Sequence, residues 1–471
     1  MHIFLSMSSF LFPLISFPYV SRILLPVGTG KVSFAISVIA YFNMFAQLGI
    51  PTYGIRACAK VRDDKLELSK TVHELLIINL LMSLIAYAFL GVSIATIERI
   101  REDKALICIV SITILLNTIG IEWMYKGLEK YTYITIRSII FKLIALVSMF
   151  LFVKTKEDYI AYGVISIFAS SASNILNFIN ARKYITIYPF HCYDFKKHIK
   201  PVLIFFAMAC ATTIYTNLDT VMLGFMANND DVGYYNAAIK IKNVLISIVA
   251  SLGTVLLPRN SYYIEHGLLD KFWSISKRAI NFVFVLALPL MLYFIIFAKE
   301  SILFLSGNEF YGAILPMQVL MPTILAIGIT NILGLQVLVP LGKERIVLYS
   351  EILGAIIDFM INLLLIPNYH ATGAAIGTLA AEVVVFCFQY RYLREKVRVF
   401  FKSVSWKSIC AGISVSILSV IPIKICFSNI FFKLLVSSLV FFCIYYCTLL
   451  VSKEPLAIDT FESVRKRFHK F

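Results

Sequence analysis

The sequence predicts an all-α polytopic membrane protein, with about fourteen transmembrane helices forming two six-helix lobes followed by two further helices. The first observation is composition: 59% of the 471 residues are hydrophobic and 15% are charged, and the mean hydropathy is +0.84. A soluble domain has about a quarter of its residues charged, so this chain has too few charges to cover a surface that faces water. The other two observations are the lengths of the apolar runs and the distribution of basic residues between them.

Fourteen apolar runs are long enough to cross a bilayer, whose hydrocarbon core of about 30 Å takes roughly 20 helical residues. They centre near residues 3–22, 32–54, 72–97, 105–125, 133–153, 159–180, 201–227, 233–258, 280–305, 313–341, 346–368, 371–392, 404–426 and 430–451. Each is expected to be a helix, because a chain in hydrocarbon must satisfy its backbone hydrogen bonds internally.

The basic residues alternate between the loops. Most of the 43 Lys and Arg residues follow even-numbered runs or lie in the C-terminal tail, as in the cluster between residues 391 and 407, whereas the loop 228–232 has none. Cytoplasmic loops of membrane proteins are enriched in Lys and Arg, so we expect both termini in the cytoplasm. The same rule accounts for the net charge of +16 without a nucleic-acid partner.

A weak internal repeat predicts the division into lobes. Gly30 opens an apolar run that ends in Leu48-Gly49-Ile50-Pro51, and Gly233 opens a second run that reaches Leu252-Gly253 and then Pro258. Many transporters are duplicated in this way. We therefore expect lobes at 1–190 and 191–398, followed by two helices and a cytoplasmic tail at 399–471.

The sequence carries no pattern of an enzyme. Gly28-Thr29-Gly30-Lys31 resembles a phosphate-binding loop, but Leu25 and Val32 stand where that loop needs Gly and Ser or Thr. The nine cysteines form no C-x-x-C pair, and the loops expected outside are too short for a catalytic domain. We expect no enzymatic activity, no metal site and no cofactor.

Several ionisable residues are expected at membrane depth, where a charge is costly and marks a candidate functional site. At about 1.5 Å per helical residue, Lys240 lies roughly 10 Å inside its run, Glu351 roughly 7 Å, Asp358 roughly 18 Å and Glu382 roughly 16 Å. Lys142 is also well inside its run, whereas Asp219 lies near the end of one.

Polar side chains repeat at helical spacing on three runs. The stripes are Asn236, Lys240, Asn243 and Ser247; Ser166, Ser170, Asn174 and Asn177; and Glu351, Asp358 and Asn362. Stripes of this kind predict a hydrated central cavity lined by Lys240. A second interpretation stays open, in which Lys240 and Lys242 pair with Asp358 or Glu382 and hold helices together.

Six segments carry a resemblance to a known family. They are FPYVSRIL (17–24), LGIPTYGIR (48–56), EWMYKGLEKYTYITIRSIIFK (122–142), LDTVMLG with VGYYNAAIKI (218–224, 232–241), GNEFYGAILPMQVLMP (307–322) and GAIIDFMINLLLIPNYHATGAAIGTLAAE (354–382). In this order they resemble the Wzx (RfbX) polysaccharide-biosynthesis flippases, whose superfamily includes the lipid II flippase and the multidrug and toxin extrusion (MATE) transporters. The chain departs from that pattern at Asp358 and His370, commonly Asn and Gly, and at Met1, where relatives usually still have a cytoplasmic leader.

The resemblance implies a flippase that moves undecaprenyl-pyrophosphate-linked oligosaccharide repeat units from the inner to the outer leaflet of the bacterial cytoplasmic membrane by alternating access. Arg22, in the S-R-x-L segment, matches a cavity arginine of the lipid II flippase. With Lys142 and Lys240 it is expected to neutralise the pyrophosphate, beside the amides of Asn236 and Asn243. The expected partners are this lipid-linked oligosaccharide, membrane lipid and polysaccharide polymerase or assembly proteins.

The runner-up is a MATE-like cation or drug antiporter coupled to Na⁺ or H⁺. Asp219, Asp358 and Glu382 would then bind the cation, and Glu351 is a further candidate for ion coupling or gating. The sequence leaves open the sugar, the coupling ion and whether the glycan is O-antigen, capsule or exopolysaccharide.

Overall fold

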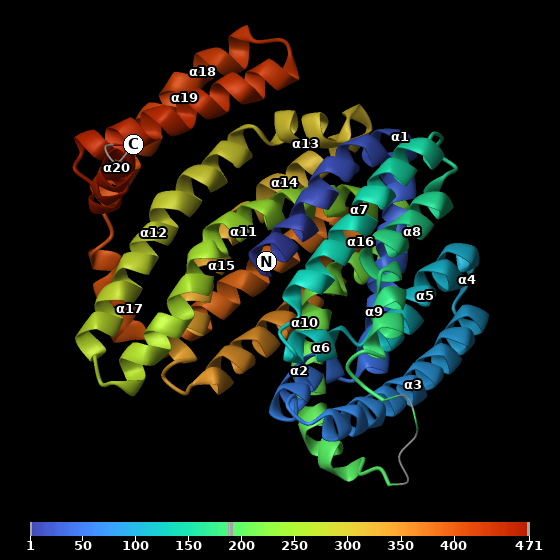
Figure 1. Ribbon diagram of the computed structural model, residues 1–471. Helices are drawn as coiled ribbons and strands as arrows, with labels where there is room; N and C mark the ends of the chain where they lie inside the picture. The colour runs from blue at the N-terminus through green and yellow to red at the C-terminus, as the bar shows by residue number, and fades with distance from the viewer. Residues whose placement is uncertain (1, 187, 189–191, 469–471) are drawn as a thin grey trace. The chain divides into compact units, whose positions relative to one another are not determined.

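The computed structural model describes residues 2–186, 188 and 192–468, with the side chains of 2–14, 252–255, 460 and 463–468 left aside; Met1 lies outside these residues. All regular structure in the described part is helical (Figure 1). The chain forms two compact units, Met1–Asn236 and Ala237–Phe471, and each is described by itself. The lobes expected at 1–190 and 191–398 stay a prediction.

The N-terminal unit is built around the long helices α1, α3 and α10, and α1 packs against α3, α5, α7 and α10. Its elements are α1 (His2–Gln47), α2 (Ile50–Lys60), α3 (Lys65–Thr96), α4 (Glu98–Glu102), α5 (Lys104–Gly120), α6 (Glu122–Gly127), α7 (Tyr131–Phe152), α8 (Tyr159–Ile167), the π-helix η1 (Phe168–Ala172), α9 (Asn174–Ala181), α10 (Lys196–Met226) and the start of α11 (Asn229–Glu265). Asp64 caps α3 by accepting hydrogen bonds from the backbone N–H groups of Leu66 and Glu67. A hydrophobic cluster that includes Leu75 and Trp123 joins α2, α3 and α6.

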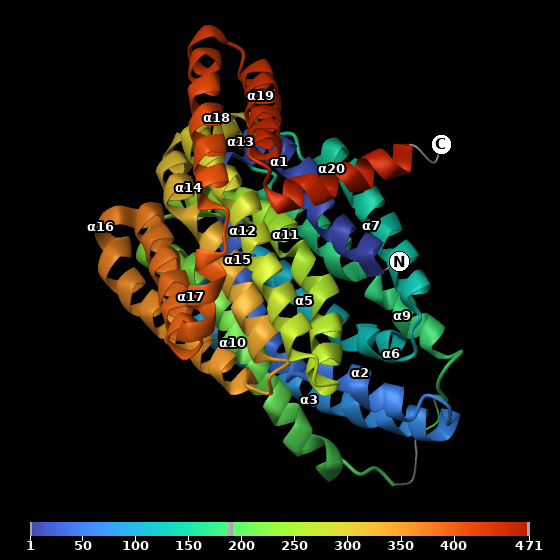
Figure 2. The ribbon, with the colours of Figure 1, turned by 90° about the vertical axis from the view of Figure 1, so that its left-hand side faces the viewer.

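The C-terminal unit carries a helical hairpin near its end. Its elements are the rest of α11, then α12 (Leu269–Ile296), α13 (Ala298–Ser306), the 3₁₀-helix η2 (Asn308–Ala313), α14 (Ile314–Leu320), α15 (Pro322–Asn331), the π-helix η3 (Ile332–Leu338), α16 (Glu344–Tyr392), α17 (Arg394–Lys402), α18 (Trp406–Cys426), α19 (Ile430–Val451) and α20 (Pro455–Phe468). Helices α18 and α19 lie side by side (Figure 2). A 2.9 Å hydrogen bond between the hydroxyls of Tyr293 on α12 and Ser437 on α19 fixes this hairpin to α12.

Two helices are bent and long enough to cross a membrane twice. Helix α1 has 46 residues and α16 has 49, or about 70 Å each at 1.5 Å per residue, against about 30 Å of hydrocarbon. The first bends at Leu25 (φ 60°) and the second at His370 (φ 51°). Leu25 precedes Pro26, and a residue before proline is disfavoured in the α conformation, so the sequence itself ends the first half of α1 there.

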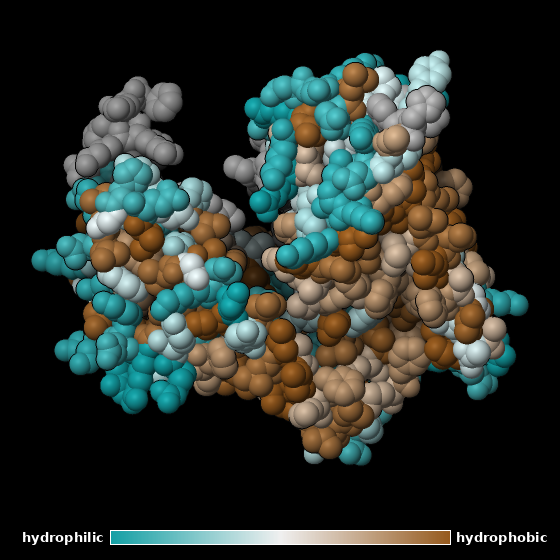
Figure 3. Space-filling model, turned by 90° about the horizontal axis from the view of Figure 1, so that it is seen from below, coloured by the Kyte–Doolittle hydropathy of each residue, from teal (hydrophilic) through white to brown (hydrophobic). Residues whose placement is uncertain are grey.

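The described chain is a polytopic membrane protein. Ten of its helices are long and apolar enough to span a bilayer, and the bent pair Asn308–Leu320 and Pro322–Leu338 makes up to eleven. Large apolar side chains such as Leu84, Leu364 and Leu418 are more than 60% exposed, and hydrophobic side chains cover broad areas of the face in Figure 3. Such a surface is typical of a protein in contact with lipid, so the predicted all-α polytopic class is confirmed, and the number of fourteen spans stays a prediction.

Candidate functional site

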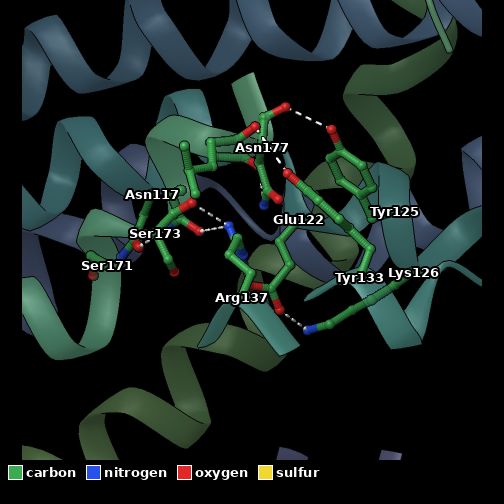
Figure 4. A network of polar contacts seen from close by, with 12 residues as sticks. Asn117, Glu122, Tyr125, Lys126, Tyr133, Arg137, Ser171, Ser173 and Asn177 are labelled. Carbon is green, nitrogen blue, oxygen red and sulfur yellow. Dashed lines mark hydrogen bonds and ion pairs between the residues drawn. The ribbon is translucent and has the colours of Figure 1, made fainter. Parts of the chain in front are cut away.

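A buried arginine lies at the centre of a polar network in the N-terminal unit. Arg137 of α7 is 5% exposed. One guanidinium nitrogen, Nη1, donates hydrogen bonds to the carbonyl of Ser173, at 2.6 Å, and to Oδ1 of Asn174, at 3.3 Å. The other, Nη2, lies 3.5 Å from a carboxylate oxygen of Glu122. Figure 4 shows Arg137 between Ser173 and Glu122. A permanent positive charge is therefore held in the unit by oxygen acceptors from α6 and from the start of α9.

The break in that helix explains why a carbonyl is available to the arginine. Between α8 and α9 the chain forms the π-helix η1, and Ser173 follows it directly. A π-helical turn displaces the i to i−4 hydrogen-bond pattern and is frequent at functional sites. Arg137 supplies a donor at this junction.

Asparagine side chains extend the network across four helices. Asn174 donates to Oδ1 of Asn117 at 3.2 Å, and Asn117 donates to Oδ1 of Asn43 at 3.4 Å. The chain from Arg137 through these amides therefore joins α7, α9, α5 and α1. Gly120 allows the close approach, because a Cβ there would lie 2.6 Å from Cγ of Asn174.

Asn177 completes the stripe that the sequence places on the sixth run. It is fully buried, donates to the carbonyl of Gly120 at 2.8 Å, and its own carbonyl accepts a 2.6 Å hydrogen bond from the hydroxyl of Tyr125. The predicted stripe thus forms helix-to-helix hydrogen bonds at Asn174 and Asn177.

The residues predicted to bind substrate lie in both units. In the N-terminal unit, exposed Arg22 donates to the carbonyl of Pro18, half-buried Lys142 lies on α7, and Asn236 donates to the carbonyl of Val232 at 2.9 Å. In the C-terminal unit, half-buried Lys240 and exposed Asn243 lie on α11. Their gathering around one cavity stays a prediction.

Three of the four predicted acidic residues are buried. Asp219, Asp358 and Glu382 are 8%, 2% and 4% exposed, whereas Glu351 is exposed. Asp219 accepts a short hydrogen bond from the Tyr235 hydroxyl.

Asp358 lies where the two halves of α16 pack closely. Asn362, one turn further along the same stripe, donates to it at 3.3 Å. A Cβ on Gly377 would come within 2.8 Å of Oδ1 of Asp358, so glycine is needed for this approach. Among the described residues, no group of three or more His, Cys, Asp or Glu side chains could hold a metal ion.

Sequence reasoning selected Lys142 on α7 and missed Arg137 on the same helix. Counting residues inward from the end of a run favours the deeper charge, but burial depends on which face of a helix meets its neighbour. The signal lay in Asn174 and Asn177, whose amides on one stripe required polar partners on adjacent helices.

The sequence profile described as "Polysaccharide biosynthesis protein" matches residues 1–263, more than half of the chain. The chain belongs to this polysaccharide biosynthesis protein family. It is similar to the "Putative O-antigen transporter" of Shigella dysenteriae, with 28% identity over 391 residues that cover 82% of this chain and 97% of that protein.

Two solved structures share the fold of this family member. The lipid II flippase MurJ in an inward closed conformation superposes with a TM-score of 0.74 and 15% identity, covering 96% of this chain and 99% of that one. An inward-facing multidrug resistance MATE transporter of the MOP superfamily gives a TM-score of 0.62 and 14% identity, covering 83% and 95%. The resemblance found in the sequence is confirmed for family and fold.

Proposed function

We propose that the protein is a flippase that moves undecaprenyl-pyrophosphate-linked oligosaccharide repeat units from the inner to the outer leaflet of the bacterial cytoplasmic membrane. It acts as a transporter, not as an enzyme. The observation that carries the proposal is a fold shared with a lipid II flippase over 96% of the chain, in a protein that places basic and amide side chains on its membrane-spanning helices. Similarity to an O-antigen transporter along 97% of that relative supports it.

The proposed topology has fourteen spans in two six-helix lobes plus the α18–α19 hairpin, with both termini in the cytoplasm. Three features support the count beyond the eleven candidate spans. Helices α1 and α16 each have a bend that divides them into two membrane-length halves, and the apolar helix α5 has 17 residues. The alternation of basic loops in the sequence supports the orientation.

In the proposed mechanism, cationic side chains neutralise the pyrophosphate while the polyprenyl tail stays in lipid. Arg22, Lys142 and Lys240 take this role, and Asn236 and Asn243 hydrogen-bond the polar headgroup. A charge that crosses the membrane gains about 2.3 kcal/mol per 100 mV, so an interior-negative potential assists outward movement of the anionic substrate.

The test is protein-dependent movement of a radiolabelled undecaprenyl-pyrophosphoryl sugar between the leaflets of reconstituted vesicles. We expect Lys240→Ala to lose most of the transport, and Lys277→Ala, an exposed lysine on α12, to retain it. Equal transport rates in wild type and Lys240→Ala would show that Lys240 takes no part in substrate binding. No movement of any lipid-linked sugar would reject the flippase.

The buried carboxylates favour a second candidate, a MATE-like antiporter coupled to Na⁺ or H⁺. Asp219, Asp358 and Glu382 would bind a cationic substrate or the coupling ion, because buried acidic groups in a membrane mark ion pathways. Uptake of organic cations under a Na⁺ or H⁺ gradient, without movement of lipid-linked sugars, would establish this function in place of the first.

A further inference from the structure

Helix α10 is fastened to the N-terminal unit mainly at its two ends. Its buried residues are His198 and Val202 at one end and Asp219, Thr220, Met222, Leu223 and Gly224 at the other. No residue from 203 to 218 is buried. The best-buried contacts of α10 are therefore those at its two ends, while Phe205 and Phe206 also lie against Gly49.

A fully buried carboxylate fixes the N-terminal end of α10. Glu74 of α3 is 0% exposed. One of its oxygens, Oε2, accepts hydrogen bonds from Nζ of Lys197 at 2.9 Å and from Nε2 of His198 at 2.8 Å. The other, Oε1, accepts from the backbone N–H of Asp194 at 2.7 Å. A negative charge is favourable here, because the N-terminus of a helix carries a partial positive charge.

A tyrosine connects the same cluster to a third helix. The hydroxyl of Tyr53 on α2 lies 2.8 Å from Nδ1 of His198. The imidazole therefore bridges α2 and α3, and the first turn of α10 is fixed to both.

A guanidinium fixes the C-terminal end of α10. Arg99 of α4 donates through Nε to the carbonyl of Gly224 at 2.6 Å and through Nη2 to Oδ1 of Asn229 at 2.5 Å. Its guanidinium also lies 5.0 Å from the ring centroid of Phe34 on α1. The C-terminus of a helix carries a partial negative charge, so the sign of this contact is again favourable.

A glycine contact beside Arg99 keeps this end tightly packed. A Cβ on Gly30 would lie 1.8 Å from the carbonyl oxygen of Asn229. Only glycine lets α1 approach the start of α11 this closely, so the contact depends on the two backbones lying together.

We propose that these two contacts are alternate latches of the transport cycle, the Glu74 latch opening towards the cytoplasm and the Arg99 latch opening towards the outside. The proposal rests on alternating access as proposed above. Lys197 and Gly224 are separated by 27 residues, or about 40 Å of helix, which exceeds the hydrocarbon thickness of about 30 Å. One latch can therefore break at each membrane surface while the other holds α10 in place.

The test measures distances between spin labels at each end, in a variant without native cysteines. Labels at Ala59→Cys and Lys200→Cys report the Glu74 latch, and labels at Thr96→Cys and Asp230→Cys report the Arg99 latch. We expect Glu74→Gln to raise the ratio of long to short distances at the first pair about tenfold or more, the effect of losing charged hydrogen bonds. Arg99→Gln should do the same at the second pair only.

Matched controls are Glu67→Gln on α3 and Arg101→Gln on α4, both exposed, and both should leave the distances at wild-type values. If Glu74→Gln does not fold, Lys197→Gln weakens the same latch. Unchanged distances in both latch variants, or lengthening of both pairs by either one, would overturn the proposal. The distances are measured without substrate, so they test the latches separately from transport. If the latches open selectively but no lipid-linked sugar moves in the vesicle assay, only the proposed flippase function is rejected.

Discussion

Replacing Arg137 by alanine tests whether the buried network holds the N-terminal unit together. The guanidinium makes a 2.6 Å hydrogen bond to the Ser173 carbonyl and a 3.3 Å one to Asn174. Hydrogen bonds to charged groups contribute about 1.5–3 kcal/mol each, and the second is long. We therefore expect Arg137→Ala to lower the free energy of unfolding by about 2–4 kcal/mol.

The matched control removes the other basic partner of Glu122. Lys126 lies 2.8 Å from that carboxylate, but both side chains are about one-third exposed. An exposed pair one helical turn apart contributes about 0.3–0.5 kcal/mol, so Lys126→Ala should have a small effect. The assay is unfolding in mixed micelles with increasing dodecyl sulfate, followed by tryptophan fluorescence. Equal losses in the two variants would refute the reasoning.

Two further predictions concern backbone packing and pH. Gly120→Ala should lower the unfolding temperature because its Cβ would meet Asn174, whereas Gly91→Ala, with nothing within 4 Å, should not; equal temperatures would contradict the close approach. Backbone N–H groups of Lys154 and Thr155 hold the pKa of Asp158 below its usual 3.8. The charged carboxylate therefore contributes to stability above that pH, and this contribution is lost as the pH falls through the lower pKa of the folded state. The difference in unfolding temperature between wild type and Asp158→Asn should therefore shrink on acidification below about pH 4, and a constant difference would contradict the assignment.

The sequence was sufficient for the fold class because burial in lipid depends on composition and run length. The same reasoning predicted the Asp358 and Asn362 stripe, since residues four apart share a helix face. It expected separate helices at 3–22 and 32–54, and the non-helical residue Leu25 does divide α1 into two halves there, although hydropathy could not show that a single residue, without a longer loop, joins them.

The contacts that fix the ends of α10 were less accessible to sequence reasoning. Glu74 and His198 are 124 positions apart, and Arg99 meets Gly224 across 125. Taken singly, Glu74, His198 and Arg99 resemble ordinary polar residues near the end of a span. Only the packing of α10 against α2, α3 and α4 brings these opposite charges and helix ends together.

The bend of α16 at His370 has a consequence for membrane insertion. The non-helical residue His370 joins two halves, each long enough to cross the bilayer, without a longer loop between them. Asp358 of the first half is buried and lies against Gly377 of the second. The first half alone would lack this contact, so the burial of the carboxylate depends on insertion of the second half beside it.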